Sequence, residues 1–251
     1  VKDRAALFIV RDALKKKLIS RGGTIVEGTA GNTGIGLAIV CKEYGLNLKI
    51  VIPKTQSIEK KETLKKLGAE LIEVDAVPYA NSKNYIKQSK KIAEDLNEKS
   101  SNGVYWANQF DNIINTEAHI QTTAKEIWNQ TAGSIDGFVC AVGTGGTLAG
   151  VSIGLKEKNK SIQIALSDPM GSALYSHVKN NKLESSGGSI TEGIGTGRIT
   201  KNFDKALIDD AFKTDDVEAL NLVYDLIENQ KIVLGGSSGI NIAGAIKLAK
   251  K

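Results

Sequence analysis

Short apolar segments alternate with helical segments along the whole chain, and this alternation constrains the fold more than any other feature of the sequence. The first helical segment has apolar residues at i, i+3, i+4 and i+7, which predicts an amphipathic helix over residues 6–18. Such alternation is typical of an α/β fold in which helices cover mainly parallel sheet. The sequence predicts strands at residues 24–27, 48–52, 70–74, 104–106, 135–142 and 162–167, and further helices at 34–44, 57–67, 82–97, 116–130 and 216–229, with others ending near residues 156 and 250.

The length of 251 residues suits one large domain or two modest ones. The character of the chain changes near residues 106–112, so we expect two lobes of mainly parallel sheet flanked by helices. The predicted N-terminal lobe comprises residues 1–107 and the predicted C-terminal lobe residues 108–251. A Gly- and Ser-rich loop is expected at residues 185–200 of the second lobe.

Composition argues against several classes of function. The net charge of +5 comes from 33 basic and 28 acidic residues that are interleaved, so we expect no nucleic-acid partner. No apolar run is long enough to span a bilayer, and the chain start lacks a signal-peptide layout, so we expect no membrane attachment. Two cysteines are too few for a disulfide scaffold, which predicts a reducing, cytoplasmic location, and two histidines do not predict a metal site.

Gly-rich turns mark the candidate binding segments. In open α/β sheets, ligands bind at the carboxyl ends of the strands, where such turns lie. The turn GTGGT follows a strand and opens a helix, so its backbone N–H groups and threonine hydroxyls can cradle a phosphate. Leu148 stands where a dinucleotide fingerprint requires glycine, and no Walker motif is present, which favours a phosphate on a non-nucleotide cofactor. The turns are GTAGNTGIG at 28–36, GTGGT at 143–147, EGIGTG at 192–197 and GGSSG at 235–239.

The ordered series VKDRAA, TAGNTG, NQFDN, GTGGT and GGSSG resembles the cysteine synthase family, which are pyridoxal-phosphate (PLP) enzymes of the tryptophan-synthase β-like fold, fold type II. The resemblance runs the whole length of the chain and includes NTEAHIQTTAKEIWNQTAG before GTGGT. It implies a PLP-dependent transferase that makes L-cysteine from O-acetyl-L-serine and sulfide by β-replacement. It also implies a homodimer.

The resemblance assigns roles to individual residues. Lys2 matches the lysine that forms the Schiff base with PLP and then acts as base and acid at the substrate Cα. Asn32 matches the group that hydrogen-bonds the cofactor 3′-oxygen, and Ser237 matches the hydroxyl facing the pyridine nitrogen. The implied cofactor-binding residues are Lys2, Asn32, Gly143, Thr144, Gly145, Gly146, Thr147 and Ser237, and the implied substrate-binding residues are Thr29, Ala30, Gly31, Thr33, Gln109 and Gly193.

The chain departs from the family pattern in two places, and alternatives stay open. The substrate loop usually reads T-S-G-N-T-G, whereas Ala30 removes one hydroxyl here. The chain begins at the motif lysine, so we expect a chain trimmed at both ends.

Three alternative functions stay open. A β-elimination lyase such as a cysteine desulfhydrase would use nearly the same residues, and cystathionine β-synthase shares the loop. A non-catalytic paralogue would act as a binding subunit. Threonine dehydratases carry a G-N-H variant, against which Asn32 and Thr33 argue.

Overall fold

The computed structural model describes residues 1–29 and 31–251, so Ala30 lies outside the described residues. The chain divides into two compact units, Val1–Asn115 and Thr116–Lys251. Within the described ranges, no helix combines the length and apolar character that a bilayer-spanning segment needs.

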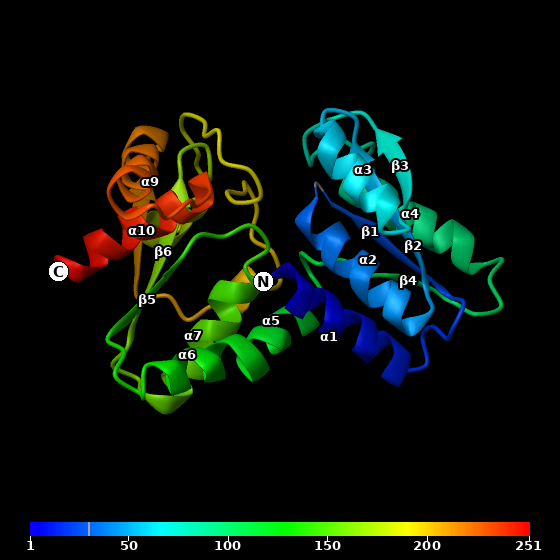
Figure 1. Cartoon of the computed structure of the whole chain (residues 1–251), viewed down its shortest axis with the longest axis horizontal. Helices are drawn as coiled ribbons and strands as arrows, with labels where there is room; N and C mark the ends of the chain where they lie inside the picture. The colour runs from blue at the N-terminus through cyan, green and yellow to red at the C-terminus, as the bar shows by residue number, and fades with distance from the viewer. Residues whose placement is uncertain (30) are drawn as a thin grey trace. The chain divides into compact units, whose positions relative to one another are not determined.

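The first unit is built on a four-stranded parallel sheet in the order β3-β2-β1-β4 (Figure 1). Its register sets Ile25 beside Leu48 on one side and beside Tyr105 on the other. Strand β1 is therefore central, which matches its almost complete burial. The strands are β1 (Thr24–Gly28), β2 (Asn47–Pro53), β3 (Glu70–Val74) and β4 (Val104–Trp106).

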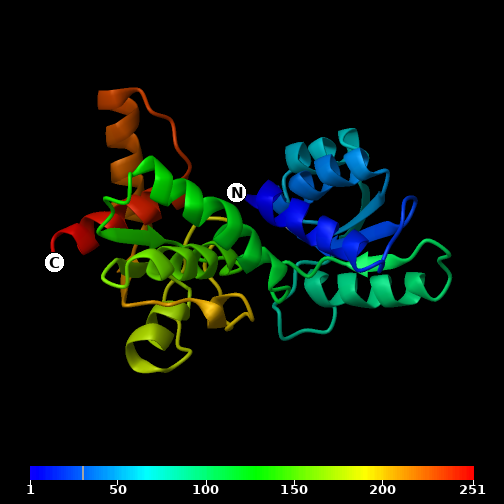
Figure 2. The ribbon, with the colours of Figure 1, turned by 90° about the horizontal axis from the view of Figure 1, so that it is seen from below.

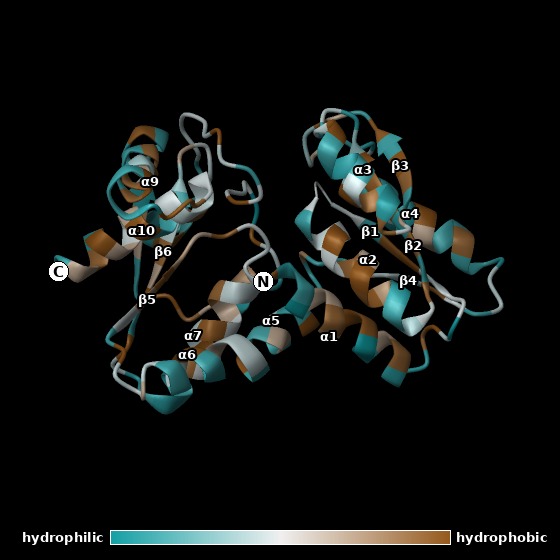
Figure 3. Cartoon of the chain, in the orientation of Figure 1, coloured by the Kyte–Doolittle hydropathy of each residue, from teal (hydrophilic) through white to brown (hydrophobic). Residues whose placement is uncertain are grey.

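Helices cover both faces of this sheet (Figure 2). Helices α1 (Lys2–Lys15), α2 (Asn32–Tyr44) and α3 (Ile58–Lys66) share one core with Ile25 and Ile50, while α4 (Tyr85–Asn97) packs against Val26 and Val51 on the other face. The α1 ribbon carries both apolar and polar segments in Figure 3, as expected of an amphipathic helix. Its start lies close to α2, because a Cβ on Gly36 would come within 3.1 Å of the Asp3 Cα.

The second unit is built on a three-stranded parallel sheet in the order β5-β6-β7. One core joins β6 to helices α7 and α8, and the opposite face of β6 is covered by α10, where Gly244 lies against Ser167. Helix α9 packs on α10. The elements are β5 (Gly137–Cys140), α7 (Gly146–Lys158), β6 (Gln163–Pro169), α8 (Leu174–Asn180), η2 (Phe203–Lys205), β7 (Asp210–Thr214), α9 (Asp216–Gln230) and α10 (Gly236–Ala249).

A π-helix interrupts the helical segment that precedes β5. The segment consists of α5 (Ile114–Ala118), the π-helix η1 (His119–Ala124) and α6 (Lys125–Gln130). The π-helix packs on α7 at two glycines: a Cβ on Gly150 would meet the His119 Cβ at 2.5 Å, and one on Gly154 would meet the Ala124 Cβ at 2.5 Å. Single π-turns inside helices often mark functional sites.

The predicted α/β class with parallel sheets is confirmed, and several predicted boundaries need correction. The expected strand 135–142 extends only over Gly137–Cys140, and the expected helix 82–97 begins at Tyr85 because Asn84 accepts a hydrogen bond from the Ile86 N–H as its N-cap. The opening helix starts earlier than predicted and ends at Lys15. Strand β7 and helix α8 were not predicted at all.

Candidate active site

In the first unit, three polar side chains meet at one oxygen atom. The Gln109 Oε1 accepts a hydrogen bond from the Thr33 hydroxyl at 2.6 Å and one from the Lys2 Nζ at 3.4 Å. Gln109 and Thr33 are buried, whereas Lys2 is half-buried at the first position of α1. The Lys2 amine and the buried Thr33 hydroxyl therefore share one acceptor, the amide oxygen of Gln109.

The turn after β1 presents small polar groups at the start of α2. The Thr29 hydroxyl accepts from the Gly31 N–H at 3.2 Å, and Gly31 is the N-cap of α2 with φ of 155°. Glycine adopts this backbone conformation without steric cost. Asn32 is exposed at the first helical position, while Thr29 and Thr33 are buried. The turn therefore offers hydroxyls, an amide and helix N-terminal N–H groups, a donor set that suits an anionic group.

The NQFDN segment holds Gln109 by local hydrogen bonds. Asn108 has φ of 49°, a left-handed conformation that asparagine tolerates better than most residues. The Asn112 side chain donates to the Ala107 carbonyl at 3.0 Å and to the Tyr105 hydroxyl at 3.1 Å. The Asn115 side chain donates to the Gln109 carbonyl at 2.9 Å. The asparagines thus fix the backbone from which the Gln109 side chain projects.

Glu27 belongs to this group of residues, and sequence reasoning assigned it no role. Its carboxylate is 1% exposed near the end of β1, and it accepts from the Gln109 backbone N–H at 3.4 Å. Burial raises the pKa of Glu27 to about 8, although hydrogen bonds from Gln109 and the charge of Lys2 oppose the shift. In the sequence it stands only as one polar residue before a glycine turn, so no signal there reveals its burial.

In the second unit, the GTGGT turn is held tightly by its surroundings. A Cβ on Gly143 would come within 2.2 Å of the Gly193 carbonyl oxygen, and one on Gly145 within 2.5 Å of the Phe203 nitrogen. Gly145 is also the N-cap of α7 with φ of 89°. The Thr144 carbonyl accepts from the Thr200 hydroxyl at 2.6 Å. Glycine is thus required at two positions, and neighbouring backbone and the Thr200 hydroxyl hold the turn in place.

His119 orients the last threonine of this turn, which sequence reasoning also did not foresee. The His119 Nε2 lies 3.3 Å from the Thr147 Oγ1, and its Nδ1 lies 2.8 Å from the Thr123 Oγ1. The imidazole is 1% exposed within the π-helix. The Thr123 contact has the i, i+4 spacing visible in the sequence, whereas the Thr147 contact depends on tertiary packing.

Ser237 lies in the first turn of α10 and is tied to the end of β5. The Asn241 side chain donates to the Ser237 carbonyl at 2.7 Å and accepts from the Ala141 N–H at 2.7 Å. The Gly195 N–H donates to the Val142 carbonyl at 2.7 Å, which brings the 193–195 stretch to the same edge of the sheet. Asn241, one helical turn after Ser237, was also missed by sequence reasoning.

The structure collects the predicted residues into one group in each unit. The second group offers backbone N–H groups at the start of a 13-residue helix and threonine hydroxyls, which fit a phosphate monoester. No cluster of His, Cys, Asp and Glu suited to a metal ion occurs in the part of the chain that the structure describes. Apart from Ala30, the first unit holds Lys2, Thr29, Gly31, Asn32, Thr33 and Gln109, and the second holds Gly143, Thr144, Gly145, Gly146, Thr147, Gly193 and Ser237.

Comparison with known proteins relates the whole chain to one family. The family model described as "pyridoxal-phosphate dependent enzyme" matches residues 1–251. The chain is 48% identical to cysteine synthase 1 of Neurospora crassa over 256 residues, covering 100% of this chain and 67% of that protein. It is 42% identical to the cysteine synthase of Dictyostelium discoideum over 262 residues, covering 100% of this chain and 68% of that protein.

Two solved structures share the fold. An O-acetylserine dependent cystathionine β-synthase from Helicobacter pylori superposes with a TM-score of 0.87 and 32% identity, covering 100% of this chain and 77% of that one. A hydrogen sulfide-producing enzyme from Fusobacterium nucleatum superposes with a TM-score of 0.85 and 33% identity, covering 99% of this chain and 80% of that one.

Proposed function

This chain belongs to the cysteine synthases within the pyridoxal-phosphate dependent enzyme family, and from that premise we propose that it makes L-cysteine from O-acetyl-L-serine and sulfide by β-replacement. The observation that carries the proposal is the meeting of Lys2, Thr33 and Gln109 at one oxygen atom. This meeting puts an amine beside groups able to bind a carboxylate, as the chemistry of an amino-acid substrate requires.

In this proposal the second unit holds the cofactor's phosphate and ring. The 143–147 turn binds the phosphate through its backbone N–H groups and the hydroxyls of Thr144 and Thr147. His119 fixes the Thr147 hydroxyl, which supports this role. Ser237 would hydrogen-bond the pyridine nitrogen, and the 193–195 stretch would line the cofactor. When bound, pyridoxal phosphate supplies the electron sink for bond breaking at the substrate Cα and Cβ.

The first unit is proposed to bind and activate the substrate. Thr29, Thr33 and Gln109 hold its carboxylate, with the backbone of Gly31 alongside. Lys2 would hold the cofactor through its amine and would remove and return the proton at the substrate Cα. Asn32 donates to the cofactor's 3′-oxygen. The tight hydrogen bond between Thr33 and Gln109 supports their action as one unit.

The proposal is tested by visible absorption of the purified chain with pyridoxal phosphate, then O-acetylserine, then sulfide. A cofactor band that shifts with O-acetylserine and returns with sulfide, with L-cysteine as product, is the expected result. Lys2→Ala is expected to abolish turnover and the band of the lysine-bound cofactor. Lys16→Ala is the matched control, because Lys16 is an exposed lysine of the same region that pairs with Asp12, a residue with no role in the proposed site. Turnover by Lys2→Ala at the wild-type rate would overturn the assignment of Lys2.

A second candidate function is β-elimination, which the resemblance to a hydrogen sulfide-producing enzyme favours. Elimination would use the same residues up to loss of the leaving group. It predicts that pyruvate accumulates after O-acetylserine or cysteine is added, and that sulfide does not restore the starting spectrum. A chain that binds no cofactor would instead support a non-catalytic binding subunit.

We further propose a cytoplasmic homodimer that acts on small molecules. The proposal keeps the two predicted lobes. The lobe of residues 1–107 carries the substrate loop, and the lobe of residues 108–251 carries the phosphate turn. Light scattering during size-exclusion chromatography tests the dimer, and fractionation of the source cell tests the location.

A further inference from the structure

Glu27 is a buried carboxylate that the proposed mechanism does not use. It is 1% exposed on the central strand β1, two residues before Thr29. A buried carboxylate is costly unless hydrogen bonds or a counter-charge satisfy it. Its contacts therefore indicate what the residue does.

The contacts of Glu27 converge on Gln109. The Gln109 backbone N–H donates to its Oε2 at 3.4 Å, and the Gln109 side chain also hydrogen-bonds the carboxylate, as does the Asn108 backbone. Lys2, at the start of α1, is a charged group that acts on Glu27 and lowers its pKa. The contacts from the 108–109 segment are made by uncharged groups.

The orientation of the Gln109 amide follows from these contacts. Its oxygen accepts from Thr33 and Lys2, so its NH₂ group is the part that donates to Glu27. An anionic substrate carboxylate needs a hydrogen-bond donor, so the NH₂ group of Gln109 must face the substrate in place of the amide oxygen. A protonated Glu27 can donate its O–H to the amide oxygen and release the NH₂ group.

We propose that Glu27 is a positioning residue that sets which end of the Gln109 amide faces the substrate, so that binding of the substrate carboxylate is coupled to protonation of Glu27. The proton comes from solvent, and no covalent bond changes. The coupling rests on the proposed function, because it assumes that Gln109 binds the substrate carboxylate. It also removes a like charge from beside the incoming anion.

The test measures the dissociation constant of L-serine, which has the substrate's carboxylate but no acetate to lose, from the shift of the cofactor band between pH 6.5 and 9.5. At pH values above the pKa of Glu27, the dissociation constant of serine for the wild-type holoenzyme is expected to increase by up to tenfold per pH unit relative to that for Glu27→Gln. Calorimetry in two buffers of different ionisation enthalpy is expected to show additional proton uptake on binding by the wild type near pH 9. Glu73→Gln is the matched control, since Glu73 is a carboxylate of β3 that pairs with Lys61.

A double-mutant cycle with Gln109→Leu separates positioning from general damage. If Glu27 acts through Gln109, Glu27→Gln is expected to leave the pH dependence of serine binding unchanged in the Gln109→Leu background. Equal pH dependence in the wild type and Glu27→Gln, with the cofactor band intact, would overturn the role of Glu27 alone. Absence of the band in the wild type would overturn the proposed function together with this coupling.

Discussion

Gly150 lies directly against His119, so that a Cβ added to Gly150 would fall 2.5 Å from the His119 Cβ and 2.4 Å from the Thr116 carbonyl oxygen. The close approach lets the π-helix bring His119 within reach of Thr147. One small residue in α7 thereby supports a contact to the proposed phosphate turn.

Gly150→Ala is therefore expected to destabilise the protein. Alanine favours a helix by about 1 kcal/mol over glycine, but overpacking against backbone costs about 1–3 kcal/mol, so we expect a net loss. The urea midpoint should fall, and pyridoxal phosphate should bind more weakly. Gly188→Ala is the control, because a Cβ at Gly188 has no atom within 4 Å among the described residues. An unchanged midpoint in Gly150→Ala would contradict the packing argument.

The sequence predicts elements whose signals are local. Ser57 accepts from the Lys60 N–H as the N-cap of α3, and Gly68, with φ of 92°, follows its last turn. Strand β3 is found at its predicted bounds, residues 70–74. In such elements, capping, turn and apolar-pattern signals all occur within the segment itself.

Tertiary contacts set the elements that the sequence does not predict. The seven-residue helix α8 begins where the buried Asp168 accepts from the Tyr175 N–H at 2.7 Å. The burial of Glu27 and the contact of His119 with Thr147 likewise join residues far apart in the chain. The order of the motifs along the chain suggests the site residues. The residues that position them are identified only from the folded structure, because their contacts join distant parts of the chain.

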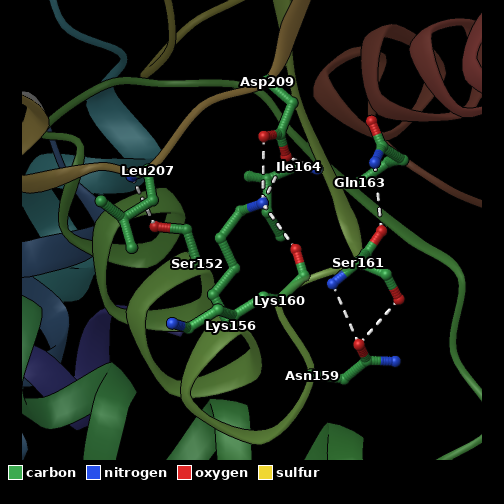
Figure 4. A network of polar contacts seen from close by, with 9 residues as sticks. All are labelled: Ser152, Lys156, Asn159, Lys160, Ser161, Gln163, Ile164, Leu207 and Asp209. Atoms are coloured by element: carbon green, nitrogen blue, oxygen red, sulfur yellow. Dashed lines mark hydrogen bonds and ion pairs between the residues drawn. The ribbon is translucent and has the colours of Figure 1, made fainter.

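Asp209 ties the end of α7 to the middle of the second sheet (Figure 4). It accepts from the Lys156 Nζ at 2.7 Å and from the Ile164 N–H at 2.8 Å. Asp209→Ala removes both acceptors and leaves a buried N–H without this partner, so we expect a loss of about 1–3 kcal/mol in the free energy of unfolding. Urea unfolding followed by circular dichroism measures it.

The exposed ion pair of Lys54 with Asp75 provides the comparison. Asp75→Ala is expected to change the unfolding midpoint little, because exposed pairs contribute little to stability. If Asp209→Ala and Asp75→Ala lowered the free energy of unfolding equally, the hydrogen bond from the Ile164 N–H to Asp209 would add no stability beyond that of an exposed ion pair, which would contradict this prediction.

Ser237→Asp is expected to change the outcome of the reaction more than the affinity for the cofactor. A carboxylate facing the pyridine nitrogen would hold it protonated and make the ring a stronger electron sink, which favours a longer-lived carbanion over prompt loss of the leaving group. The ratio of cysteine to pyruvate formed from O-acetylserine and sulfide should therefore change. Ser238→Asp, at the next position along α10, is the control. Identical product ratios in Ser237→Asp and the wild type would contradict the proposed position of Ser237.

Glu27 is expected to make the stability of the first unit depend on pH. Its pKa rises from 4.5 to about 8 on burial, so between these values the folded state binds more protons than the unfolded state. The free energy of unfolding should therefore fall as pH rises through this window, by up to about 1.4 kcal/mol per pH unit. Glu27→Gln removes the ionisable group and should flatten this dependence.

Trp106 allows the first unit to be followed alone, in a Trp128→Phe background, since Trp106 lies in β4 and Trp128 lies in α6 of the second unit. Urea unfolding monitored by its fluorescence at several values between pH 5 and 8 gives the slope. Glu73→Gln should retain the wild-type slope, because the Lys61 ammonium lowers the pKa of Glu73 and keeps it ionised throughout this range. A wild-type slope that survives in Glu27→Gln would mean that another group is responsible.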